Sequence, residues 1–151
     1  MHRGGIGRTR EEIARQVEEK EQTIYDWASY VPVSSAVAKL KTWKNQGAEI
    51  LYLTSRKRPD EVASIEGVLK KHGFPVGQLL FRRENQQYKD VAERAMPDVL
   101  VEDDCESIGG TDEMTITHVK PEIRERIKSI PVKEFGGIDH LPDEITALVE
   151  Y

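Results

Sequence analysis

The chain has only one cysteine and no long hydrophobic run. The single Cys105 excludes an internal disulfide framework and any zinc cluster built on cysteines. No apolar segment approaches the roughly 20 residues that a membrane helix needs. The amino-terminal residues also lack the apolar core of a secretory signal. We therefore expect a cytoplasmic protein without a membrane partner.

Basic residues are in deficit as well. The 22 Lys and Arg residues oppose 27 Asp and Glu residues, so the formal net charge is -5. This balance disfavours a surface that coats nucleic acid, although a local basic patch keeps a nucleic-acid partner open. The chain is 38% hydrophobic and 32% charged, as globular proteins are, and its 151 residues predict one domain over residues 1–151.

Short apolar runs alternate with helical patterns, which is typical of an α/β fold with a parallel sheet. We expect a Rossmann-like three-layer sandwich whose sheet is mainly parallel. The predicted strands cover residues 49–53, 78–81, 98–101 and 114–117. One helix is predicted directly after a capping box at Thr9. Further helices are predicted from 34 or 35 to Gly47, from 59 to Gly73, from 88 to 97 and from 121 to 128, and a last one after Pro142.

Polar side chains follow three of these strands. Thr54, Ser55 and Arg56 come after the first strand, Arg82 and Arg83 with Lys89 after the second, and Asp103 and Asp104 after the third. The carboxyl ends of parallel strands share one edge of a sheet, where ligands of such folds bind. Hydroxyls and a lysine there suit a phosphate, and paired carboxylates suit Mg²⁺. The set predicts a phosphoryl-transfer site.

Each feature also has a structural explanation. A Thr-Ser pair after a strand commonly caps a helix, a lysine on an amphipathic helix is commonly solvated, and paired aspartates are common in turns. Arg56 and the residues that follow it suit a solvated loop about as well as a phosphate grip. Cys105 is best explained as a structural residue, and Trp27 and Tyr30 as helix-packing residues. The phosphoryl-site hypothesis therefore depends on the combination of features.

The order of these features resembles the haloacid dehalogenase-like (HAD) hydrolase superfamily. Its second motif is an apolar strand ending in Thr or Ser, its third a helical Lys, and its fourth an apolar strand ending in acids. Segments 50–56, Lys89 and 99–104 match them in that order. The resemblance implies that Thr54, with Ser55 and Arg56 beside it, binds phosphate, that Lys89 stabilises the charge, and that Asp103 and Asp104 hold Mg²⁺. Receiver domains are disfavoured because their acidic pair comes first in the chain.

The family's first motif has no counterpart in this sequence. That motif is an apolar strand ending in Asp-x-Asp, which supplies the nucleophile and the general acid. Asp26 follows no apolar strand and has no second Asp, so the role is not assigned to it. In the family this strand lies in the middle of the sheet, and its loss leaves backbone groups unpaired in a core. We expect Met1 to be an internal methionine of a longer protein; the alternative is a degenerate relative in which another segment or chain fills the gap.

The functional expectation is a Mg²⁺-dependent phosphatase acting through an aspartyl-phosphate, with no large cap domain because few residues separate the motifs. The chain alone is expected to be inactive, since it lacks the nucleophile. The alternative is a non-catalytic HAD-like module that binds phosphate and Mg²⁺ or a partner. The substrate class stays open among nucleotides, sugar phosphates, phosphoproteins and nucleic-acid ends. An open site of this kind implies a bulky substrate or a homo-oligomer that supplies the lid.

Overall fold

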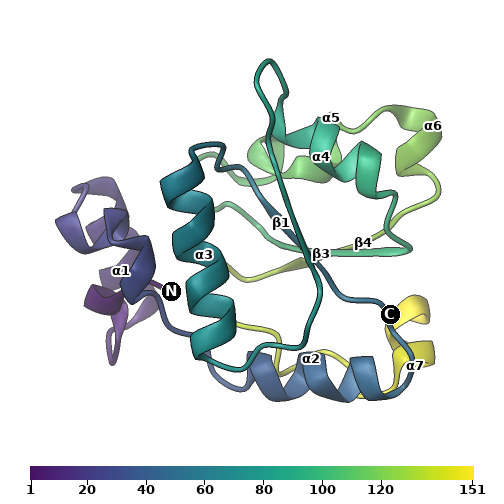
Figure 1. The fold of residues 1–151 in the computed structure, drawn as a ribbon, viewed down its shortest axis with the longest axis horizontal. Helices are drawn as coiled ribbons and strands as arrows, with labels where there is room; N and C mark the ends of the chain where they lie inside the picture. The colour runs from purple at the N-terminus through teal and green to yellow at the C-terminus, as the bar shows by residue number, and fades with distance from the viewer.

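The computed structural model describes residues 1–151 and has an α/β fold (Figure 1). The strands are β1 (Leu51–Thr54), β2 (Gln78–Phe81), β3 (Val99–Asp103) and β4 (Lys128–Val132). The α-helices are α1 (Arg10–Glu18), α2 (Ala36–Asn45), α3 (Pro59–Lys71), α4 (Tyr88–Ala95), α5 (Thr115–His118), α6 (Pro121–Arg124) and α7 (Ile145–Glu150). Four short 3₁₀ helices accompany them: η1 (Arg3–Gly5), η2 (Gln22–Tyr25), η3 (Trp27–Ser29) and η4 (Gly110–Glu113).

Local sequence signals explain where several helices begin and end. The capping box predicted at α1 is confirmed: the Glu12 N–H donates to Thr9 Oγ1 (3.3 Å), and the Thr9 N–H donates to the Glu12 carboxylate (2.8 Å). Pro59 occupies the first turn of α3, where its missing N–H costs no hydrogen bond. Gly47 follows α2 with φ of +99°, a conformation that glycine adopts without strain.

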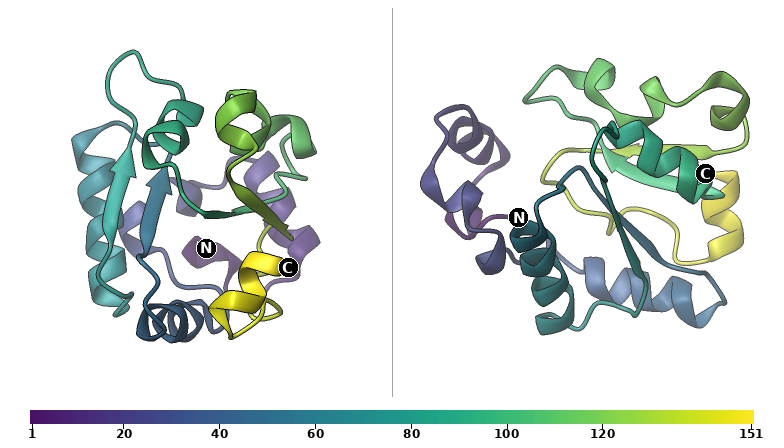
Figure 2. Two further views of the ribbon diagram at one scale, coloured as in Figure 1. Left: turned by 90° about the vertical axis from the view of Figure 1, so that its right-hand side faces the viewer. Right: turned by 45° about the horizontal axis from the view of Figure 1, so that its top comes forward.

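The strands form two separate parallel pairs. β1 pairs with β2 from Leu51↔Gln78 to Thr54↔Phe81, and β3 pairs with β4 from Val99↔Lys128 to Asp103↔Val132. β1 and β3 do not pair with each other, so the expected continuous sheet is replaced by two two-stranded sheets. Figure 2 shows the two pairs side by side, with β1 and β3 as the inner strands. The parallel α/β character is therefore confirmed, while the sheet is interrupted at its centre.

Gly77 fixes the close approach of the first pair. A Cβ atom at this position would lie 2.1 Å from the carbonyl oxygen of Ile50 and 3.0 Å from the ring of Tyr52. Any other residue would therefore push the chain before β2 away from β1. The Tyr52 hydroxyl donates to the carbonyl of Pro75 (2.7 Å), which ties the same two segments together.

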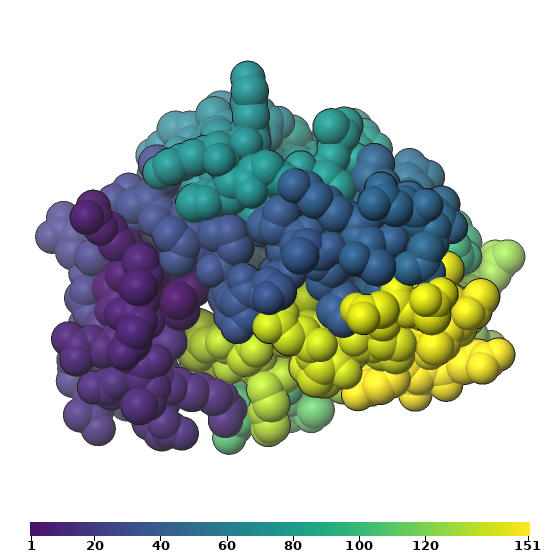
Figure 3. Space-filling view, turned by 90° about the horizontal axis from the view of Figure 1, so that it is seen from below, coloured from purple at the N-terminus to yellow at the C-terminus, as the bar shows by residue number.

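Two apolar clusters lie on opposite faces of β3. One joins Leu100 to Ala92 of α4 and to the segment that carries α5. The other joins Ile130 and Val132 of β4 to Trp43 of α2, with Val99 and Val101 packed against it. The alternation along β3 is that of a strand between two layers of helices. Figure 1 shows α4, α5 and α6 on one side of the strands and α2 and α7 on the other, and Figure 3 shows α2 against the carboxyl-terminal segment.

The strand predicted at 114–117 is wrong. Thr115–His118 forms the short helix α5, although Thr and Ile favour strands. The Glu102 carboxylate accepts hydrogen bonds from the N–H groups of Thr115 (2.8 Å) and Ile116 (3.0 Å), which satisfies the first donors of the helix. The helix expected to run from 121 to 128 also ends early, as α6 at Arg124, because the chain then enters β4.

The fourth strand is Lys128–Val132, which contains Pro131. Proline lacks an N–H group, and this normally argues against a strand. Here the Lys128 N–H donates to the carbonyl of Asp98 (2.8 Å), so the backbone groups of alternate residues, 128, 130 and 132, face β3. The nitrogen of Pro131 faces the outer side, where no strand pairs. β4 tolerates the proline because it is an edge strand.

No helix of the structure combines the length and the apolar character needed to cross a membrane.

Candidate functional site

A cleft of about 720 Å³ separates the two strand pairs. Its walls are the segment from Glu49 to Leu53, which includes most of β1, and the segment from Ala95 to Glu102, which includes most of β3. Trp43 of α2 and residues of α7 contribute to the lining as well, and most lining residues are hydrophobic. The carboxyl ends of β1 and β3, with the polar residues predicted from the sequence, lie at one end of these walls.

Thr54 is the last residue of β1 and is half-buried. Its Oγ1 accepts a hydrogen bond from the N–H of Arg56 (3.2 Å), which bends the chain directly after the strand. The guanidinium of Arg56 lies 4.2 Å from the ring centre of Trp27, a cation–π contact with the amino-terminal segment. Ser55 accepts a hydrogen bond at its carbonyl oxygen from the Arg82 side chain (2.5 Å). Of these three residues, Thr54 therefore best suits the predicted role of phosphate binding, whereas the Arg56 guanidinium already contacts Trp27.

Lys89 lies in the first turn of α4, as its predicted role requires. It is half-buried, and no carboxylate lies within 4 Å of its ammonium group. The preceding residue, Tyr88, places this turn beside the acidic end of β3. Burial, helped by the charges of Glu102 and Asp103, raises the pKa of the Tyr88 hydroxyl to about 12. The structure thus brings the start of α4 and the end of β3 together.

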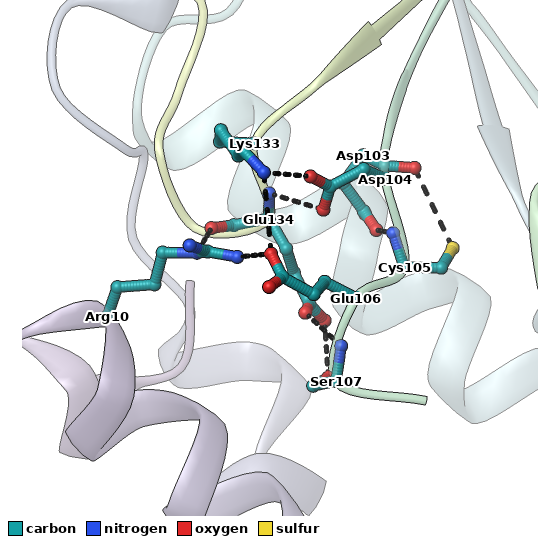
Figure 4. A network of polar contacts seen from close by, with 8 residues as sticks. All are labelled: Arg10, Asp103, Asp104, Cys105, Glu106, Ser107, Lys133 and Glu134. Carbon is teal, nitrogen blue, oxygen red and sulfur yellow. Dashed lines mark hydrogen bonds and ion pairs between the residues drawn. The ribbon is translucent and has the colours of Figure 1, made fainter. Parts of the chain in front are cut away.

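Asp103 and Asp104 have different surroundings (Figure 4). An oxygen of Asp103 accepts the N–H of Cys105 (3.0 Å), and the Asp103 side chain forms no ion pair. Asp104 accepts the N–H of Glu134 (3.1 Å) and pairs with the ammonium of Lys133 (3.2 Å). Burial would raise the pKa of Asp104, but these two donors outweigh it and the pKa is lowered. Asp104 therefore joins β3 to β4, and Asp103 is the carboxylate free for a ligand.

Five further residues of this polar network could not be predicted from the sequence. Arg10 of α1 pairs with Glu106 and donates to the carbonyl of Glu134 (3.2 Å), and Lys133 also approaches Glu106 (3.5 Å). The Glu134 carboxylate accepts hydrogen bonds from Ser107 (2.8 and 2.9 Å). These residues come from three distant segments, and β4 was not predicted as a strand. No sequence signal placed Lys133 at a strand end.

The structure leaves one free carboxylate for the expected magnesium site. The chain contains no group of three or more His, Cys, Asp or Glu side chains that could hold a metal ion. Asp104 is already occupied by Lys133 and the Glu134 N–H, which leaves Asp103 as the single free carboxylate of the predicted pair. Mg²⁺ usually keeps several waters and is held by one or two carboxylates. The magnesium site therefore stays a prediction, and no chemical step is assigned to a metal.

Cys105 is expected to be a poor nucleophile, and its rate of alkylation tests the surroundings of this site. Burial, together with the neighbouring Asp103 carboxylate, raises the pKa of its thiol to about 12. The thiolate is the reactive form, so alkylation by iodoacetamide at pH 8 should be at least ~10-fold slower in the folded protein than in guanidinium chloride. Mass spectrometry over time measures both rates. Equal rates would contradict the half-buried position beside Asp103.

Comparisons with family models, curated proteins and solved structures found no match to this chain.

Proposed function

We propose that this chain carries the phosphoryl-binding side of a phosphohydrolase of the HAD type. The observation that carries the proposal is the half-buried Lys89 in the first turn of α4, which has no carboxylate partner. Lysine buries its aliphatic stem and keeps its ammonium group in water, so an ammonium without a carboxylate partner is available to an anion. The amino terminus of α4 lies at the same place, and its capping box already uses the Gln87 side chain and the Asp90 carboxylate.

Thr54 supplies the second element of this anion site. α4 packs against β1, and Leu53, the neighbour of Thr54, packs against the cluster that contains Ala92 of α4. The hydroxyl at the end of β1 and the first turn of α4 therefore flank one end of the cleft. A hydroxyl that donates, an ammonium group and a helix terminus together suit the oxygens of a phosphoryl group.

The chain does not itself supply the carboxylate that accepts the phosphoryl group in such enzymes. Asp26 lies between the 3₁₀ helices η2 and η3, not at the end of a strand. The proposed roles are thus limited to binding and orientation: Thr54 and Lys89 position the phosphoryl group, and Asp103 stands at the same edge as a further polar group. The proposal expects phosphate binding by the chain alone, and turnover only where a carboxylate is added.

A non-catalytic phosphate-binding module is the second candidate. The observation in its favour is the use of Asp104 as a structural partner of Lys133, which leaves only part of an acidic motif for chemistry. Both candidates bind phosphate, so phosphate binding tests what they share and turnover separates them.

Inorganic phosphate is expected to bind saturably to the chain, and Thr54→Val is expected to lower its affinity about 10- to 100-fold. The reason is that valine keeps the shape of threonine but removes a hydrogen bond to a charged group, worth about 1.5–3 kcal/mol. Phosphorus NMR titration measures the affinity. Lys41→Met is the control, because Lys41 is exposed on α2, on the other side of the strands from α4, and its change should leave the affinity within about twofold. Absence of saturable phosphate binding would overturn both candidates.

A further inference from the structure

The inner edge of β3 has no partner strand. The Lys128 N–H donates to the carbonyl of Asp98, and the Asp104 N–H donates to the carbonyl of Val132, each at 2.8 Å. In a parallel ladder the backbone groups of successive residues point to opposite sides. The even-numbered residues of β3 therefore direct their N–H and C=O groups toward β4, and the groups of Val99 and Val101 point away from it.

No strand occupies the side toward which Val99 and Val101 point. β3 pairs only with β4 and β1 only with β2, and both inner strands line the cleft. Backbone groups at an apolar surface cost free energy unless they are hydrogen-bonded. Two-stranded sheets are also marginal on their own. The cleft thus combines free hydrogen-bonding edges with sheets that gain stability from another strand.

The size and lining of the cleft fit one extended segment. Packed protein interiors contain few voids larger than a water molecule. A volume of about 720 Å³ corresponds to roughly 24 waters at about 30 Å³ each, yet its walls are mainly hydrophobic. Such a space suits a chain with apolar side chains on both faces, as central parallel strands have.

The direction of the added strand follows from its neighbours. Ala48, just before β1, and Val99, the first residue of β3, both pack against the cluster that contains Leu148 of α7. Figure 1 shows β1 and β3 both leaving the side of α7 and crossing the molecule in the same general sense. A strand between them therefore forms parallel ladders on both sides only if it runs in that sense.

We propose that the cleft between β1 and β3 accepts one further β-strand, an extended segment of about five apolar residues that lies outside residues 1–151. This segment runs parallel to β1 and β3 and hydrogen-bonds to both. A second copy of the chain is a poorer occupant, because each of its four strands is already paired. The inference rests on strand pairing and packing and does not depend on phosphate binding.

The direct test is titration of the protein with a fluorescent peptide, Val-Ile-Val-Ile-Val flanked by lysines for solubility. We expect saturable binding, and amide exchange at Val99 and Val101 at least ~10-fold slower in the complex. The amides of Leu100 and Glu102 should change little, because they already face β4. Absence of binding, or of this alternating protection, would overturn the proposal.

Two controls separate strand addition from adhesion to an apolar surface. A peptide that is N-methylated at alternate residues keeps its hydrophobicity but loses donors, and it should bind at least ~10-fold more weakly. Equal binding of the two peptides would refute strand pairing. If the same protection arises without peptide as the protein concentration rises, a second copy is the occupant and the proposal fails.

A pair of valine variants locates the binding site. Val149 lines the cleft and is 51% exposed, whereas Val76 is 85% exposed and lies outside the cleft. Val149→Glu should weaken peptide binding about 10-fold because it places a charge beside an apolar segment. Val76→Glu adds the same charge and should leave the affinity unchanged. Equal effects would place the peptide elsewhere.

Discussion

Replacing Trp43 by alanine is expected to lower the free energy of unfolding by about 3–5 kcal/mol, as deletion of a large core side chain does. The side chain is 4% exposed and is the largest member of the cluster that joins α2 to β4 and to the carboxyl-terminal segment. Its Nε1–H also donates to the carbonyl of Pro142 (2.9 Å). Alanine therefore leaves a cavity and removes the partner of a carbonyl oxygen.

Urea denaturation followed by circular dichroism measures this loss. Lys41→Ala is the neighbouring control on α2, because Lys41 is exposed and its change should stay within about 0.5 kcal/mol. Trp43→Phe should fall between the two, since it keeps an aromatic ring but loses the N–H donor. A Trp43→Ala variant as stable as the control would mean that α2 does not hold the carboxyl-terminal segment in place.

Lys89→Met is expected to lower kcat/KM for a phosphate ester by about 10²–10³, in a form of the protein extended by a strand that ends in Asp-x-Asp. The ammonium group is the unpaired positive charge at the start of α4, and methionine keeps much of the side-chain volume without that charge. The loss should appear mainly in kcat, because the negative charge on the transferring group needs a fixed cation.

Hydrolysis of p-nitrophenyl phosphate gives the rates. Lys41→Met is again the control, with an expected change of less than about twofold. If the extended protein has no activity and Asp103→Asn leaves phosphate binding unchanged, the hydrolase proposal fails and the binding module remains. Peptide binding in the cleft between β1 and β3 is measured without turnover. Failure of the hydrolase proposal is therefore distinguishable from failure of the proposal that this cleft accepts a further strand.

The sequence predicted those elements that depend on local signals. The capping box at Thr9, the proline at the start of α3 and the apolar run of β2 each determine their own segment, and the structure has them at these positions. The strand ends were predicted to within two residues, since β1 runs one residue past the predicted end, to Thr54, and β3 runs two residues past it, to Asp103.

What the sequence could not predict depends on contacts between distant segments. β4 was missed because Pro131 argues against a strand unless the edge position is known. Thr115 and Ile116 favour a strand by residue type, but they form α5, which the Glu102 carboxylate caps. Glu102 lies 13 residues before Thr115, so no local signal indicates this contact. The pairing of Asp104 with Lys133 was hidden for the same reason, and so was the contact of Arg56 with Trp27.

Pro131 has a consequence for how large an assembly this sheet can join. The outer edge of β4 presents a ring nitrogen without a proton at its exposed proline, so an incoming strand finds a broken ladder there. Growth of the β3–β4 sheet is thus directed inward, to the edge of β3. A strand bound in the cleft would be enclosed between two existing strands, which gives a complex of one segment per chain. On the β4 side the proline acts as a stop against fibre-like polymerisation.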